Sequence, residues 1–206
     1  MRIVAASAPA ALDDAETELR AGRIVAIPTE TVYGLAVLPI DAGLVRLVAA
    51  KQRSADKGIA LLVDSVEQVN AVARLTTTAV ALAARFWPGP LTLVLPQLPA
   101  NRLPDLLTGG RTTIGVRLPD HVVPRALAAR LGPLAVSSAN ISGQPDATNA
   151  TRVVETLADE VTLVIDDGPV RGGVPSTVVA CLDDGSLQIL REGAISEADV
   201  RAAARK

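Results

Sequence analysis

The chain of 206 residues is 49% hydrophobic and 20% charged, and its net charge at pH 7 is −2. A chain of this length and apolar content forms one large domain, or two small ones, around a sizeable core. Proteins that bind nucleic acid over a broad surface are usually basic, so the acidic balance restricts any RNA contact to a local patch. One Trp, one Tyr and one Phe are too few for a base-stacking platform.

Single copies of cysteine and histidine limit the chemistry further. Cys181 stands alone, so no intrachain disulfide forms and a reducing cytoplasm is the expected location. With His121 as its one histidine, the chain is not expected to hold a His/Cys metal site, and we expect no protein-bound metal. The N-terminal segment turns acidic at Asp13 without a long apolar core, which excludes a signal peptide. No apolar run reaches ~18 residues, so no membrane span is expected.

The first expected elements are a helix over residues 10–21 and a short strand over residues 24–27. Pro28 ends that strand, and the polar group Thr29, Glu30 and Thr31 follows at its exit. Ligands bind at strand exits in α/β sheets, which favours a binding role for this group. The alternative is that Thr29 or Thr31 caps the start of a helix.

A basic segment follows a helical stripe that contains residues 44–48. Lys51, Arg53 and Lys57 lie within seven positions, directly before an apolar run over residues 59–63 that has the length of a buried strand. Three cations on a loop that is fixed to a sheet suit a phosphate-bearing ligand. The alternative is an ordinary charged face in contact with water.

The middle of the chain predicts helices over residues 66–75 and 80–85, a turn over 86–90, a strand over 91–95 and a loop over 103–111. Two prolines around Gly89 make the turn rigid, and we expect Phe86 and Trp87 to fill the core beneath it. The next strand, residues 112–118, places Thr113 and Arg117 on one face, about 13 Å apart. Gly115 between them leaves room for a ligand. A solvated sheet face is the alternative.

The last third predicts a helix over residues 122–131, a strand over 133–136, and a polar loop over 137–143 that carries Ser137, Ser138 and Asn140. This loop offers hydrogen-bond donors to an anion or nucleotide, although an ordinary polar turn has the same composition. A helix over 151–157, strands over 161–165, 176–179 and 187–190, a hairpin turn at 183–186 and a final helix capped by Ser196 complete the prediction. The fold class is α/β with a mixed sheet. Neither a G-x-G-x-x-G nor a P-loop motif is present.

Seven motifs occur in order: PTETVYGLA (28–36), KQR-x₃-K (51–57), FWPGPLTLVL (86–95), TIGVRLP (113–119), SSANISG (137–143), GVPSTVV (173–179) and LREG (190–193). Together they resemble the YrdC-like family, the L-threonylcarbamoyladenylate synthases of the TsaC type. The resemblance implies a single domain over residues 1–206 with its core at about 12–199. It also implies a twisted mixed sheet with flanking helices around a large open cavity.

The resemblance also implies an activity. L-Threonine, bicarbonate or CO₂, and ATP with Mg²⁺ would give threonylcarbamoyl-AMP and pyrophosphate, and a downstream transferase complex would modify tRNA. The carbamate of threonine would attack the α-phosphate while Lys51, Arg53 and Mg²⁺ neutralise the leaving pyrophosphate. A weak tRNA contact is compatible with this activity. The alternative is an RNA- or ribosome-binding factor of the same fold without catalysis.

Site residues carry over by motif position. Lys51 and Arg53 match catalytic positions, and the positions that contact ATP are Arg53, Lys57, Thr113, Ser138, Asn140 and Arg191. The positions around threonine are Thr31, Arg117, Ser137 and Ser176. A guanidinium such as that of Arg117 suits the carboxylate of an amino acid. Two departures from the family pattern are Ser54, where many relatives have proline, and the absence of the longer members' second domain.

Overall fold

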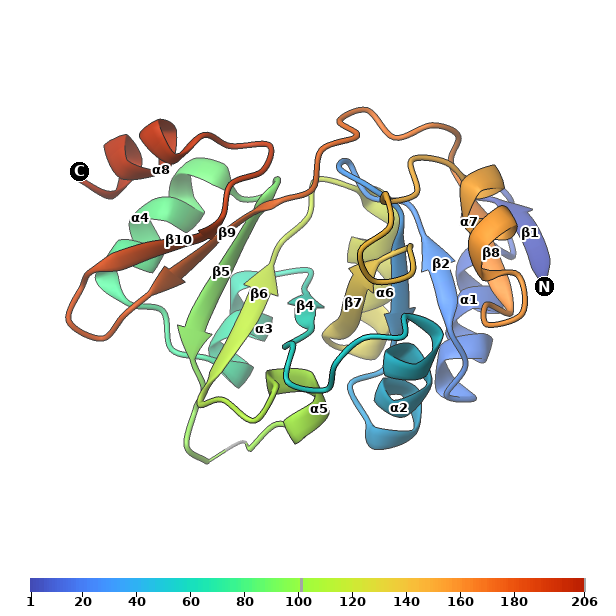
Figure 1. Ribbon diagram of the computed structural model, residues 1–206, viewed down its shortest axis with the longest axis horizontal. Helices are drawn as coiled ribbons and strands as arrows, with labels where there is room; N and C mark the ends of the chain where they lie inside the picture. The colour runs from blue at the N-terminus through green and yellow to red at the C-terminus, as the bar shows by residue number, and fades with distance from the viewer. Residues whose placement is uncertain (101, 206) are drawn as a thin grey trace.

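The computed structural model describes residues 1–100 and 102–205. In these residues the chain forms a ten-stranded sheet in the order β1-β8-β2-β3-β7-β4-β6-β5-β9-β10. Parallel and antiparallel pairs are mixed: β4 runs parallel to β6, for example, and antiparallel to β7. The sheet extends along the molecule, and the two chain ends lie at opposite ends of it (Figure 1). The predicted mixed α/β sheet is therefore confirmed.

The strands are short and largely apolar. They are β1 (Arg2–Ala5), β2 (Val25–Ile27), β3 (Gly34–Val37), β4 (Ala60–Leu62), β5 (Leu91–Pro96), β6 (Thr113–Arg117), β7 (Leu134–Ser138), β8 (Leu163–Asp166), β9 (Thr177–Cys181) and β10 (Leu187–Arg191). The central strands are buried on both faces, which explains why they read as continuous apolar runs rather than as alternating patterns.

The helices connect these strands. They are α1 (Ala11–Arg20), α2 (Asp41–Ala50), α3 (Val66–Val72), α4 (Thr77–Phe86), α5 (Asp105–Thr108), α6 (Val122–Leu131), α7 (Ala150–Leu157) and α8 (Glu197–Ala204). Side-chain caps define several of their first turns. Ser196 Oγ accepts from the Asp199 N–H at the start of α8, as the sequence predicts. None of the helices in the described ranges has the length and apolar character needed to cross a membrane.

The sheet has a different environment on each face. On β4, Leu61 packs into the larger apolar cluster, while Leu62 belongs to a smaller cluster that contains residues of α1 and α6. On β6, Ile114 and Val116 face the larger cluster, and the alternate residues Thr113, Gly115 and Arg117 line a cavity. The period of two predicted for this strand is thus the reason that polar residues are exposed to the cavity.

Three expectations about secondary structure need correction. Thr29 does not cap a helix: its Oγ1 accepts from the N–H groups of Thr31 and Val32, a local turn that leads into strand β3. The expected loop over 103–111 contains the short helix α5, which ends at Gly109 in the left-handed conformation. Strand β1, which pairs with β8 at the sheet edge, was not predicted.

Candidate active site

The centre of the sheet carries a cavity of about 510 Å³. This is within the roughly 300–1,000 Å³ that is typical of small-molecule sites. Strands β4, β5, β6, β7 and β9 supply apolar floor residues such as Leu62, Val94 and Val136. Four arginines line the cavity, Arg53, Arg111, Arg117 and Arg191, and no Asp or Glu is among its described lining residues. Such a cavity attracts anionic ligands.

Arg53 lies at one wall and fixes the basic segment. Its Nη1 donates to Ser137 Oγ at 2.9 Å, and its Nη2 donates to the main-chain oxygens of Lys57 and Gly58 at 3.1 and 3.0 Å. Its Nε is buried and makes no hydrogen bond. Burial lowers the pKa of the guanidinium below its ordinary value. Its hydrogen-bond partners are neutral, and the charge of Asp56 only partly opposes the effect of burial, so Arg53 brings a positive charge to the cavity wall.

Lys51 lies next to the cavity but does not line it. Only 3% of the residue is exposed, and its Nζ donates to Asn140 O and Asn140 Oδ1, both at 2.8 Å, and to Ser138 O. Burial lowers the pKa of this ammonium to about 8. The three acceptors match the three donors of an ammonium, so charged Lys51 fastens the loop after β7 from below.

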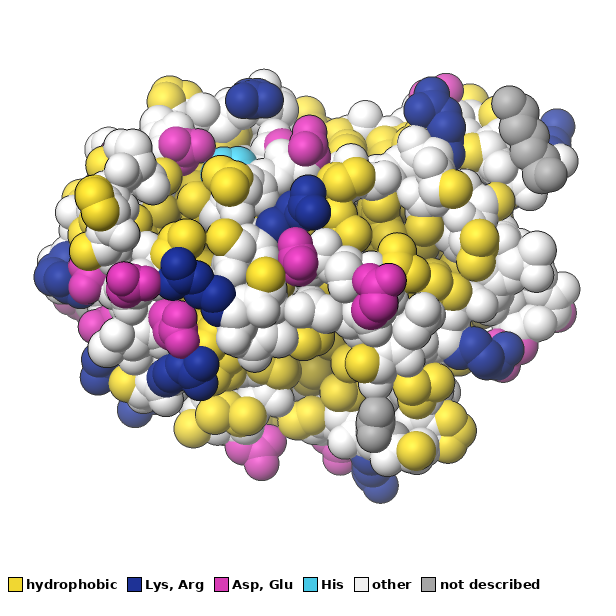
Figure 2. Space-filling model, turned by 180° about the vertical axis from the view of Figure 1, so that it is seen from behind, with side chains coloured by type: hydrophobic (Ala, Val, Ile, Leu, Met, Phe, Trp, Pro, Cys, Tyr) yellow, Lys and Arg dark blue, Asp and Glu magenta, His cyan; other side chains and the backbone are white. Residues whose placement is uncertain are grey.

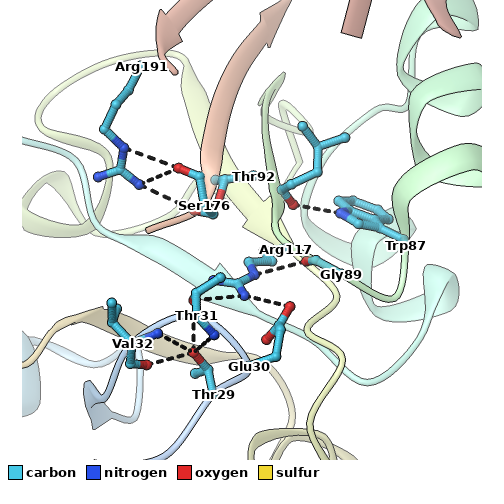
Figure 3. A network of polar contacts seen from close by, with 11 residues as sticks. Thr29, Glu30, Thr31, Val32, Trp87, Gly89, Thr92, Arg117, Ser176 and Arg191 are labelled. Carbon is cyan, nitrogen blue, oxygen red and sulfur yellow. Dashed lines mark hydrogen bonds and ion pairs between the residues drawn. The ribbon is translucent and has the colours of Figure 1, made fainter. Parts of the chain in front are cut away.

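Arg117 is held at the end of β6 by three different groups (Figure 3). Its Nε donates to Gly89 O at 3.1 Å, and both terminal nitrogens lie 3.1 Å from Thr31 Oγ1. Its Nη2 also lies 2.7 Å from Glu30 Oε1. Three hydrogen bonds and the ion pair with Glu30 occupy Nε, Nη2 and one Nη1 hydrogen, which leaves the other Nη1 hydrogen for a ligand. The rigid turn after α4 therefore does more than close the core, because it supplies the Gly89 oxygen.

Arg191, the last residue of β10, reaches back to Ser176. Its Nε and Nη2 donate to Ser176 O at 3.2 and 2.7 Å, and Ser176 Oγ lies 2.9 Å from Thr92 Oγ1 (Figure 3). Burial lowers the pKa of Arg191, partly opposed by the charge of Asp146. A cation from β10, a hydroxyl from β5 and the hydroxyl of the residue before β9 thus converge on one side of the cavity.

The structure brings most of the predicted site residues together. Eight line the cavity: Thr31, Arg53, Thr113, Arg117, Ser137, Ser138, Ser176 and Arg191. Lys51 and Asn140 lie beneath them and bond to each other. Lys57 is exposed, and its main-chain oxygen, rather than its side chain, contacts Arg53. Their individual roles remain predictions.

Sequence reasoning did not assign Thr92 or Arg111 to the site, and it included Thr29 and Glu30 only as members of the polar group at the end of the first predicted strand. Thr92 had a usable signal, since it is the one polar side chain among the apolar neighbours of strand β5. Arg111 had none: it lies in an exposed loop, and only the fold brings its Nη1 to Asp56 O at 2.6 Å. In the part of the chain that the structure describes, no three His, Cys, Asp or Glu side chains are grouped so that they could hold a metal ion.

The structure is an α/β fold whose mixed sheet carries an arginine-lined cavity on one face. The sequence model of the Sua5/YciO/YrdC family, described as "Telomere recombination", matches residues 17–193. The chain belongs to this family.

Relatives and a solved structure agree with this assignment. A threonylcarbamoyl-AMP synthase of Pyrococcus abyssi is 41% identical over 86% of this chain and 52% of the relative. A threonylcarbamoyl-AMP synthase of Chromohalobacter salexigens is 41% identical over 80% of this chain and 89% of the relative. The crystal structure of P. abyssi Sua5 complexed with L-threonine superposes with a TM-score of 0.86 and 38% identity, over 93% of this chain and 56% of that one. The chain thus spans about half the length of the Pyrococcus protein.

Proposed function

We propose that this protein is a threonylcarbamoyl-AMP synthase that takes L-threonine, bicarbonate or CO₂, and ATP as substrates. The observation that carries the proposal is a single cavity with four arginines, several hydroxyls and no lining carboxylate. The names of the relatives support it. Mg²⁺ would accompany the nucleotide as part of the substrate. The product would pass to a tRNA-modifying transferase complex in the cytoplasm.

Arg53 and Arg191 are the best placed groups for the polyphosphate. Both side chains line the cavity and are held in position by neutral acceptors. Reactions at phosphate depend chiefly on positioning and on neutralising charge, and fixed guanidinium groups do both. In this proposal Thr113 and Ser138 contribute hydroxyls to the nucleotide. Lys51 and Asn140 hold the loop that carries Ser138, and Lys57 contributes charge at the mouth.

The amino-acid substrate fits beside Arg117. Its carboxylate would accept from the remaining Nη1 hydrogen, with Thr31, Ser137 and Ser176 as neighbouring hydroxyls. The amine nitrogen of threonine forms a bond to the carbon of CO₂ and releases a proton, or reacts with bicarbonate and releases water, to give a carbamate. An oxygen of this carbamate then forms a bond to the α-phosphorus. The bond between that phosphorus and the bridging oxygen breaks, and pyrophosphate leaves. A weak tRNA contact remains compatible with this arrangement.

The direct test is release of pyrophosphate from ATP and Mg²⁺ by the purified protein. We expect release only when both threonine and bicarbonate are present, with threonylcarbamoyl-AMP detected by mass spectrometry. Folded protein that releases no pyrophosphate, or releases it equally without threonine, would refute the proposal. A binding factor would instead show salt-sensitive RNA affinity that is independent of threonine. The interspersed acidic and basic side chains on the face in Figure 2 do not favour that alternative.

Two adjacent glycines test whether the basic segment must keep its conformation. Gly109 and Gly110 have φ of +64° and +72°, so alanine costs about 1–2 kcal/mol at either position. At Gly109 the added Cβ would also meet Asp56 O, whereas at Gly110 it meets nothing within 4 Å. We expect Gly109→Ala to weaken ATP binding about tenfold, by displacing the segment that carries Arg53, and Gly110→Ala to leave it within about twofold. Calorimetric titration with ATP measures both; equal effects would contradict the packing argument.

A further inference from the structure

The four cavity arginines differ in how their charges are compensated. Among the described residues, no carboxylate lies within 4 Å of Arg53, Arg111 or Arg191, and these arginines donate hydrogen bonds to carbonyl or hydroxyl oxygens. Arg117 alone has an acidic partner, Glu30, at 2.7 Å. Asp56 and Asp146 act on these three arginines only from beyond 4 Å, so their charges are weakly compensated, whereas the charge of Arg117 is largely cancelled by direct contact.

Glu30 reaches Arg117 from behind. Its side chain is 13% exposed, and the residue lines a second cavity, of about 660 Å³, rather than the first. Both of its carboxylate oxygens are buried and accept no well-aligned hydrogen bond. An isolated buried charge is costly, and Arg117 is the cation that lies against this side chain. Glu30 therefore touches no ligand in the main cavity and acts through Arg117.

We propose that Glu30 determines which substrate occupies the Arg117 position. A guanidinium with its charge cancelled suits a zwitterion, whose carboxylate comes with its own ammonium. It disfavours polyphosphates and simple carboxylates, which bring net negative charge close to that of Glu30. Polyphosphate is favoured near Arg53, Arg111 and Arg191, because no carboxylate in contact with these arginines repels its negative charge. The inference rests on the proposed function for the identity of the two substrates. What it adds is that Glu30 makes the Arg117 position select threonine over polyphosphate.

The test compares wild-type protein with Glu30→Gln, which keeps the shape and an acceptor oxygen for Arg117 but removes the charge. The probes are L-threonine, its des-amino analogue 3-hydroxybutanoate, and pyrophosphate, each titrated calorimetrically. We expect the affinity for 3-hydroxybutanoate to be at least about ten times higher in the variant than in the wild type, because one nearby negative charge is lost. The affinity for threonine should change less. Pyrophosphate should then begin to compete with threonine. Glu160→Gln, an exposed carboxylate, is the matched control for net charge.

If Glu30 has a purely structural role, Glu30→Gln should lower the affinities for all three ligands together. That result would overturn the inference. So would an unchanged ratio of threonine to 3-hydroxybutanoate affinity. If Glu30→Gln does not fold, the wild type still decides: excess pyrophosphate should weaken ATP binding about tenfold or more and leave threonine within about twofold. Pyrophosphate that competes equally with both refutes the sorting. Absence of threonine-dependent turnover in the wild type would refute the proposed function alone, because the binding measurements need no turnover.

Discussion

We expect pyrophosphate release to fall, and folding stability to rise, as the pH increases above about 8. Both effects come from Lys51, whose pKa burial lowers to about 8 from 10.5. At pH 9 about nine-tenths of this side chain is neutral and has lost one of the three donors that hold Ser138 and Asn140. Because the loop after β7 loosens as the charged fraction of Lys51 falls from about one half to about one tenth, activity should fall about fivefold between pH 8 and pH 9.

The stability change has the opposite sign. Between pH 8 and 10.5 the unfolded chain keeps the Lys51 proton that the folded protein has released, so the unfolded state binds more protons. The free energy of unfolding should therefore rise with pH in that window, by up to about 1.4 kcal/mol per pH unit from this residue. Urea titrations at several pH values, compared with Lys51→Met, isolate the contribution, because the variant lacks the titrating group.

Lys51→Met should lose about 100-fold or more in activity at pH 7.5, with ATP affinity reduced far more than threonine affinity. Lys51→Arg should not restore activity, because a larger guanidinium with a planar fork does not match three converging carbonyl oxygens. If the stability of wild type and Lys51→Met shows the same pH dependence, the buried ammonium is not the titrating group. If Lys51→Met loses threonine and ATP affinity equally, its role as the support of the nucleotide loop is wrong.

Much of the fold could be predicted because the central strands are apolar runs bounded by clear breakers. Residues 122–131 form a helix with the predicted bounds, and Thr113 and Arg117 share a face because strand periodicity leaves no alternative. Strand β3 escaped prediction because its four residues follow a turn that is built from threonine hydroxyls rather than from a proline-glycine pair. Helix α5 is a single turn, which is too short to produce a periodic signal.

The site was harder to predict in its details than in its location. Motif positions identified eight lining residues. A lysine is normally expected at the surface, however, and Lys51 is buried beneath the cavity. The partner of Arg117 was also invisible, since nothing local connects Glu30 with a residue on a distant strand. Long-range packing determines which arginine has a carboxylate next to it. In our proposal, that contact sets which anions the arginine binds.

Replacing Arg117 should give the largest loss of threonine binding, and a second substitution should separate binding from stability. Arg117→Gln leaves Glu30 buried without a partner, which costs about 3–5 kcal/mol of folding stability. Threonine affinity should fall about 100-fold or more, because the guanidinium proposed to bind its carboxylate is gone, while ATP affinity changes a few-fold at most.

The double variant Arg117→Gln with Glu30→Gln removes the orphaned charge. Its free energy of unfolding should return to within about 1 kcal/mol of the wild type, since two neutral amides of similar shape replace the pair. Threonine binding should not return, because no cation faces the carboxylate. Thermal unfolding and calorimetric titration of the four proteins complete the cycle. Recovery of threonine binding together with stability would mean that Arg117 acts only by holding the fold, and the amino-acid position would have to be sought elsewhere in the cavity.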